Sequence, residues 1–177
     1  MNAIAYIVET LLWLVLFVVL VRLLLQWTRA DFRNPLCQAV VRLTNPLILP
    51  LRRVLPPIGK IDTASVVAVL LVAAFEVACV YALATRSFEL PPPLLWLRLV
   101  LNELARTLLR TYLFAIFLYA LLGLIAPGGY SPVQALLTSL CEPVLRPIRR
   151  MIPAVAGLDL SPLWALIAIQ ALLILIP

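Results

Sequence analysis

Two pairs of adjacent arginines are the residues of this sequence best suited to binding a charged ligand. They are Arg52 with Arg53 and Arg149 with Arg150. A guanidinium group can hold a phosphate through two parallel hydrogen bonds, so paired arginines at headgroup depth are able to bind lipid phosphate. The same pairs could equally anchor their segment at a membrane surface without a specific ligand. Both interpretations, a binding surface and a structural anchor, follow from the sequence.

The arginine pairs lie in a segment that occurs twice in the chain, at an offset of 97 residues. Six positions agree without a gap: Pro46 with Pro143, Pro50 with Pro147, Arg52 with Arg149, Arg53 with Arg150, Pro56 with Pro153, and Asp62 with Asp159. The first copy opens with Asn45 where the second has Glu142. Internal repetition of this length indicates that the protein is built from two related units.

The residue types of the repeated segment predict how its backbone folds. Asn34 can cap a helix whose first turn begins at the following proline, and apolar residues then recur at helical spacing on one side. Asn45 and Pro46 repeat this cap-and-proline signature, which predicts a second short helix, and Pro50 removes one more amide and should kink or shorten it. Asp62 and Asp159 are placed to cap the helix that follows each segment. The segment is therefore predicted to form two short interfacial helices with a bend between them.

Composition places these segments at a membrane. Hydrophobic residues make up 64% of the chain and charged residues 12%, against about 25% charged residues in a typical soluble domain. A helix needs about 20 mostly apolar residues to cross the hydrocarbon core. Four stretches meet or approach this length: 4–25, 63–85, 108–126 and 160–176. The first is too long and lacks the leading basic residues of a secretory signal, so we expect it to be retained as a span.

The distribution of basic residues predicts the topology. The segments between the first and second spans and between the third and fourth carry nine Lys and Arg residues, against four in the stretch 86–110, which leads into the third span. Short basic loops stay on the cytoplasmic side, so both repeated segments should be cytoplasmic and both termini periplasmic. The predicted fold is an all-α membrane protein with four transmembrane helices in two parallel repeats, 1–90 and 91–177. Each repeat has a proline-bent amphipathic interfacial segment between its spans, at 34–58 and 131–155.

Charged residues inside or at the edge of the predicted spans form a second candidate site. Glu76 lies in the middle of the second span, and Arg106 and Arg110 lie at the entry to the third. An ionisable group in hydrocarbon is costly unless it is paired or hydrated. Three interpretations follow: pairing of Glu76 with an arginine to fix helix packing, an ion or proton pathway, and a site that binds a partner.

Several kinds of chemistry lack their usual residues. The chain has no histidine, which removes the commonest general base and transition-metal ligand, and its three cysteines form no CxxC pair. An intramembrane hydrolase would need paired catalytic groups within the spans, and the sequence offers only Ser65 and a lone Glu76 for this role. We therefore expect no catalytic residues, no metal site, no cofactor and no nucleic-acid partner.

The repeated motif, Asn-Pro-x-x-x-Pro-x-Arg-Arg-x-x-Pro followed by an aspartate, with glutamate replacing asparagine in the second copy, resembles that of the YggT family of bacterial inner-membrane proteins, related to YlmG proteins. The resemblance covers essentially the whole chain and is to the two-repeat form. It implies a multi-pass protein of the bacterial inner membrane and associations with osmotic stress and potassium uptake, with cell division, or with assembly of a plastid cytochrome complex.

The sequence and the resemblance together lead to two functional hypotheses. The first is a non-enzymatic scaffold or assembly factor with a role in osmotic stress or envelope homeostasis. It would interact with anionic membrane lipid or a membrane-protein partner through the repeated proline and arginine segments. The second is an oligomeric, channel-like protein associated with potassium transport, in which Glu76 has a functional role.

Overall fold

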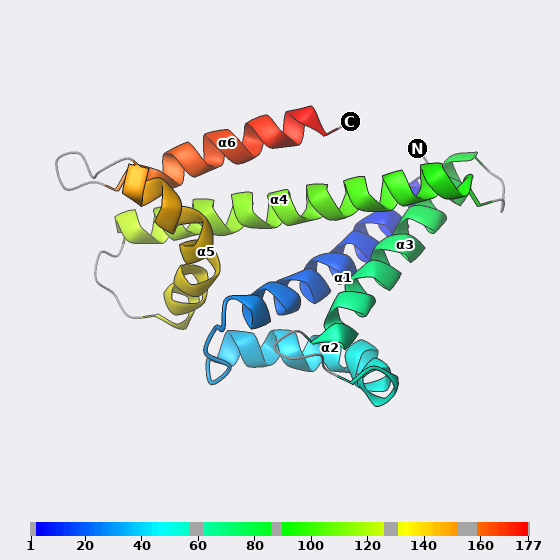
Figure 1. Ribbon diagram of the computed structural model, residues 1–177, viewed down its shortest axis with the longest axis horizontal. Helices are drawn as coiled ribbons and strands as arrows, with labels where there is room; N and C mark the ends of the chain where they lie inside the picture. Colours follow the sequence, from blue (N-terminus) through cyan, green and yellow to red (C-terminus); the bar gives the residue numbers. More distant parts are fainter. Residues whose placement is uncertain (1–2, 57–61, 86–89, 126–130, 152–158, 177) are drawn as a thin grey trace.

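The protein is all-helical in the residues that its computed structural model describes, which are 3–56, 62–85, 90–125, 131–151 and 159–176 (Figure 1). The helices are α1 (Ala3–Trp27), α2 (Pro35–Val54), α3 (Thr63–Thr85), α4 (Pro93–Ile125), α5 (Pro132–Met151) and α6 (Ser161–Leu175). No strand occurs in these ranges, so the predicted helical class is confirmed. The predicted interfacial segments 34–58 and 131–155 run beyond the described residues, and Pro153 lies outside them.

Three helices are long and apolar enough to cross a membrane: α1, α3 and α4. They correspond to the first three predicted spans. The fourth prediction, 160–176, falls on α6, which is apolar but has only 15 residues, a length of about 22 Å along its axis. The structure thus supports three spans by length and composition, and the fourth stays a prediction.

Helix α4 begins well before the span predicted at 108–126. It runs without interruption from Pro93 through the polar stretch that contains Asn102, Glu103 and Arg106. These side chains are compatible with a helix, and no proline or glycine follows Pro93 until Gly123. The polar entry to the third span is therefore the first half of a 33-residue helix.

Each repeated segment forms one helix of 20 residues, where the sequence predicted two short ones. Pro46 and Pro50 lie inside α2, and Pro143 and Pro147 lie inside α5. A proline inside a helix removes one backbone hydrogen bond and displaces the preceding turn, which bends a helix without necessarily ending it. Both helices change direction along their length (Figure 1), so the predicted bend is present but the predicted break is not.

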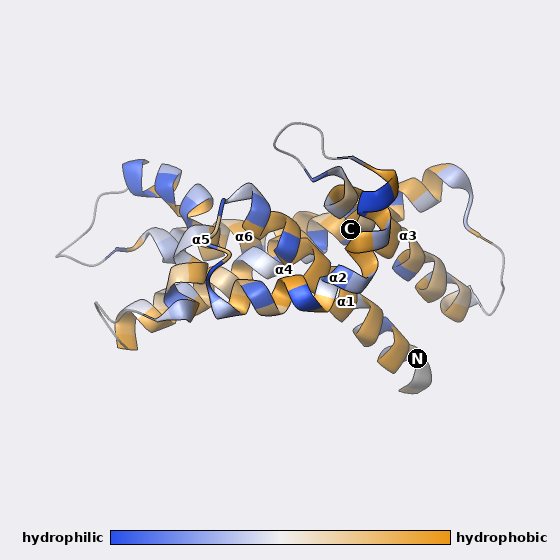
Figure 2. Ribbon diagram, turned by 90° about the horizontal axis from the view of Figure 1, so that it is seen from below, coloured by the Kyte–Doolittle hydropathy of each residue, from blue (hydrophilic) through white to orange (hydrophobic). Residues whose placement is uncertain are grey.

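The core forms where the helices of each half pack together. In the first half α1 lies against α3 and α2, and in the second half α4 lies against α5 and α6. Small buried residues on α3, among them Ala64, Ala68 and Ala73, allow α1 to approach closely. Large apolar side chains such as Leu11, Phe75 and those at the end of α4 are exposed. Figure 2 shows α1 and α3 as mostly hydrophobic, as expected of helices that face lipid.

Candidate functional site

The two repeated helices, α2 and α5, meet near their first turns. Asn34 caps α2, since its side-chain oxygen accepts a hydrogen bond from Leu36 N at 2.9 Å and Pro35 occupies the first turn. Its Nδ2 donates to the carbonyl oxygen of Pro132, the first residue of α5, at 2.6 Å. One residue thus caps the first repeated helix and ties it to the second.

Arg22 joins α1 to the middle of α2. This residue is 2% exposed, and its Nη1 donates to Val41 O at 3.2 Å, Thr44 Oγ1 at 2.7 Å and Asn45 Oδ1 at 3.0 Å. Asn45 was predicted to cap a new helix. It instead lies inside α2, where its side chain accepts from Arg22, and this contact helps to explain why α2 continues through Pro46.

Arg52, the first arginine of its pair, is bound to Asp62. Arg52 donates through Nε and Nη2 to Asp62 Oδ2, with the Nε distance 3.2 Å. Asp62 Oδ2 also accepts from Ser65 Oγ at 2.7 Å and Gln26 Nε2 at 3.2 Å. Burial disfavours the ionised carboxyl, but the hydrogen bonds from Arg52, Ser65 and Gln26 outweigh it and lower the pKa of Asp62 to about 2. Asp62 therefore stays ionised and closes the turn between α2 and α3.

The second copy builds the same closure around Arg149. Its Nε donates to Asp159 Oδ2 at 2.8 Å, its Nη1 to Glu142 Oε2 at 3.0 Å, and its Nη2 to the Tyr119 hydroxyl at 3.0 Å. Asp159 Oδ1 accepts from the backbone nitrogen of Ser161, the first residue of α6, at 2.9 Å. The N-cap position of α6 is Leu160, which makes no side-chain capping hydrogen bond. Burial opposes ionisation here too, but hydrogen bonds from Ser161 and Arg149 lower the pKa of Asp159.

The two copies carry their charge at different members of one pair of equivalent positions. Tyr119 of α4 stands at the offset of 97 residues from Arg22 of α1, as Glu142 does from Asn45. In the first copy the cationic Arg22 of α1 donates to the neutral amide of Asn45. In the second copy the neutral hydroxyl of Tyr119 and the carboxylate of Glu142 both accept from Arg149. Sequence reasoning missed Tyr119, and its alignment with Arg22 is the signal that could have revealed it.

Of the four arginines predicted to bind lipid or a partner, two form ion pairs within the chain and two form none with a described carboxylate. Arg52 and Arg149 hold the aspartates. Arg53 and Arg150 lie in the last turns of α2 and α5 with exposed side chains, and no described carboxylate forms an ion pair with either. We call Arg53 and Arg150, with the exposed Arg42 of α2 and Arg146 of α5, the basic platform.

The intramembrane charges do not form the pair that the sequence suggested. Glu76 on α3 is 3% exposed, and its Oε2 has no hydrogen-bond partner among the described residues. Arg106 Nη2 instead donates to Ile176 O at 3.4 Å, and Arg110 is exposed. Glu103 accepts from the buried Thr107 hydroxyl at 3.1 Å. Within the described ranges no group of acidic, histidine or cysteine residues is arranged to hold a metal ion.

Comparison with known proteins identifies the family. The CCB3/YggT family model matches residues 1–83 and 99–176, one match in each half of the chain. A Pseudomonas aeruginosa protein, uncharacterized protein PA0392, is 38% identical over 174 residues, which cover 96% of this chain and 85% of the relative. Uncharacterized protein YggT of Escherichia coli K12 is 34% identical over 163 residues, covering 92% of this chain and 83% of its own. No solved structure matches. The two family matches and the extent of these alignments show that the chain belongs to the CCB3/YggT family.

Proposed function

We propose that this protein is a non-enzymatic scaffold or assembly factor of the bacterial inner membrane that engages anionic lipid headgroups through its basic platform. The observation that carries the proposal is that one arginine of each pair forms an ion pair within the chain and the other forms none with a described carboxylate. Arg52 and Arg149 are held by Asp62 and Asp159, which fixes the ends of α2 and α5. The exposed neighbours, Arg53 and Arg150, are thereby presented outward.

The physical setting favours lipid phosphate as the ligand. Both helices have an apolar side that packs on the core, through residues such as Ile48 of α2 and Leu145 of α5, and such helices lie in the plane of the interface. Cytoplasmic leaflets are anionic, and each basic residue near that surface contributes about 1 kcal/mol to binding. The predicted cytoplasmic orientation would place the platform at this surface. Following the family resemblance, we assign the scaffold a role in osmotic stress or envelope homeostasis.

Removing the two exposed arginines should weaken binding to anionic lipid. We expect Arg53→Gln with Arg150→Gln to reduce affinity for phosphatidylglycerol by about 30-fold, at about 1 kcal/mol for each arginine. Mass spectrometry of the protein extracted with its native lipid, followed by lipid titration in detergent, measures this loss. Arg98→Gln, which removes an exposed charge from α4, is the control and should bind as the unaltered protein does.

Two other outcomes decide between related functions. If a membrane protein copurifies stoichiometrically and is lost in the double variant while lipid affinity is unchanged, the platform serves a protein partner. Unchanged lipid affinity without such a partner contradicts the platform proposal.

Glu76 favours a second candidate, an oligomeric protein associated with potassium transport, because a buried carboxylate without a described partner is unusual in a span. The scaffold proposal instead treats this residue as a cost to folding. An unsatisfied buried polar group costs about 1–3 kcal/mol, and the second copy has Leu173 at the matching position. We expect Glu76→Leu to raise the unfolding temperature and to leave potassium flux in proteoliposomes at the level of protein-free liposomes. A flux in the unaltered protein that this variant abolishes would favour the transport function.

A further inference from the structure

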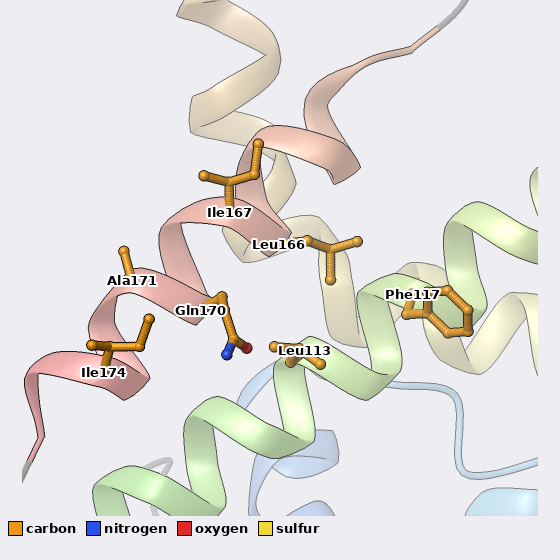
Figure 3. A pocket seen from close by; sticks show the side chains of 7 residues that line it. All are labelled: Leu113, Phe117, Leu166, Ile167, Gln170, Ala171 and Ile174. Atoms are coloured by element: carbon orange, nitrogen blue, oxygen red, sulfur yellow. The ribbon is translucent and has the colours of Figure 1, made fainter.

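A groove opens between α4 and α6, and no residue of the basic platform lines it. Its apolar part has a volume of about 550 Å³. Figure 3 shows Leu166 and Gln170 of α6 directed toward the side of Leu113 and Phe117 on α4. A polar recess of about 470 Å³ adjoins it, lined by Arg106, Arg110, Leu113, Gln170 and Leu173. Leu113 and Gln170 line both parts, so the α4–α6 groove has an apolar stretch and one basic end.

The basic end carries two cations that no described carboxylate neutralises. Arg106 donates to the carbonyl oxygen of Ile176, which is a neutral acceptor, and Arg110 is exposed. Neither forms an ion pair with a described residue, and the nearby Glu103 accepts from Thr107. Two arginines without an ion pair among the described residues, placed beside an apolar surface, favour an anionic ligand that also has an apolar part.

The equivalent positions in the first copy lie on α1 and α3 and are mostly buried. The positions that match Arg106, Leu113, Gln170 and Leu173 at the offset of 97 are Glu9, Leu16, Ala73 and Glu76. Leu16 and Ala73 are fully buried and Glu76 almost so, and α4 contacts both helices that carry these residues. In the second copy Gln170 is exposed, and Leu113 and Leu173 are only partly buried. In the second copy the site is therefore left open, with Arg106 in place of Glu9, Leu173 in place of Glu76, and Arg110 in place of Trp13.

The dimensions of the groove correspond to one leaflet. Arg106 and Phe117 are separated by about 16 Å along α4, and half of the hydrocarbon core is about 15 Å thick. The basic end lies beside Ile176, at the end of α6 remote from α5. A phosphate placed there would meet the guanidinium groups and the Gln170 amide, and an acyl chain would extend along Leu113, Phe117 and Leu166.

We propose that the α4–α6 groove binds one anionic phospholipid, with its phosphate at Arg106 and Arg110 and an acyl chain between α4 and α6. This lipid belongs to the leaflet opposite the basic platform. The proposal goes beyond the scaffold function, because it uses different residues and does not depend on the platform.

The test combines native mass spectrometry with titration of phosphatidylglycerol and of zwitterionic phosphatidylcholine in detergent. We expect one phosphatidylglycerol per chain to stay bound after delipidation. Arg106→Gln with Arg110→Gln should weaken this binding at least about tenfold. Ala171→Trp, which keeps both arginines and fills the apolar part, should weaken it by a similar factor. Arg53→Gln with Arg150→Gln is the matched control and should retain the groove lipid.

Four results would overturn the proposal. Retention of the lipid in both groove variants would place it elsewhere, and equal binding of phosphatidylcholine would remove the role of the arginines. Competition by inorganic phosphate alone would show a site for free phosphate. A dimer that dissociates in the Ala171→Trp variant would show that a second copy of the chain occupies the groove. Unfolding temperature, measured for each variant, separates these results from loss of the fold.

Discussion

Replacement of Arg22 by leucine should lower the free energy of unfolding by about 3 kcal/mol, because three buried or half-buried acceptors lose their hydrogen bonds from a charged donor. Arg22 is almost completely buried and donates to three oxygens of α2. Leucine cannot donate, so Asn45 Oδ1 would be left without this hydrogen bond at the point where Pro46 already weakens the helix. Urea unfolding in a mild detergent, followed by circular dichroism, measures the loss.

The second copy supplies the matched control for this prediction. Tyr119→Phe changes the position equivalent to Arg22 and removes a single hydrogen bond to Arg149, which keeps its contacts with Glu142 and Asp159. We expect this variant to lose about 1 kcal/mol or less. Equal losses in the two variants would contradict the idea that Arg22 organises α2, and so would a negligible loss in Arg22→Leu.

The sequence predicted the helices well because run length and apolar content decide whether a helix can span a membrane. It placed three spans on α1, α3 and α4 and the bend on the proline-rich segments. It predicted a break at Asn45 because the local cap-and-proline signature is ambiguous. The residue that removes the ambiguity, Arg22, is 23 positions away in the chain, and local patterns do not report such contacts.

The pairing of the arginines with aspartates was also beyond local reasoning. Arg52 was read as an anchor and Asp62 as a cap, each from its own surroundings. The structure brings them together because the last turn of α2 lies beside the start of α3. The repeat contained the signal, since an arginine and an aspartate keep the same separation in both copies. Positions that differ between the copies could not be assigned in the same way, because Asn45 takes its partner Arg22 from α1 whereas Glu142 takes Arg149 from its own helix.

The second prediction concerns the acid stability of the turn that Asp62 closes. Its pKa is about 2 in the folded protein and about 3.9 in an unfolded chain. A lowered pKa stabilises the fold at pH values above the unfolded pKa, and this contribution is lost as the pH falls through the folded value. A difference of about 2 pKa units corresponds to about 2.7 kcal/mol, and solvent screening at the 42% exposed side chain of Arg52 reduces the contribution to about 2 kcal/mol. It should be complete at pH 7 and decline between about pH 5 and pH 2.

Asp62→Asn should remove this contribution together with its pH dependence. Asparagine keeps one acceptor for Ser65 and Gln26 but loses the charge that pairs with Arg52. We therefore expect the unaltered protein to exceed the variant by about 2 kcal/mol at pH 7, with the difference shrinking toward zero near pH 2. Unfolding of both proteins in a non-ionic detergent across this range measures the difference, and other titrating groups cancel from it.

The equivalent substitution in the second copy tests whether burial sets the size of the effect. The side chain of Asp159 is 42% exposed, against 12% for Asp62. Solvent screens the contact between Arg149 and Asp159 more strongly, and Arg149 keeps Glu142 as a second carboxylate. Asp159→Asn should therefore cost less than Asp62→Asn at pH 7 and show a weaker dependence on pH. An equal or larger cost at Asp159 would show that burial does not set the size of the effect. The hydrogen bonds of Arg149 to Asp159, Glu142 and Tyr119 would then contribute at least as much to folding as the more deeply buried Asp62.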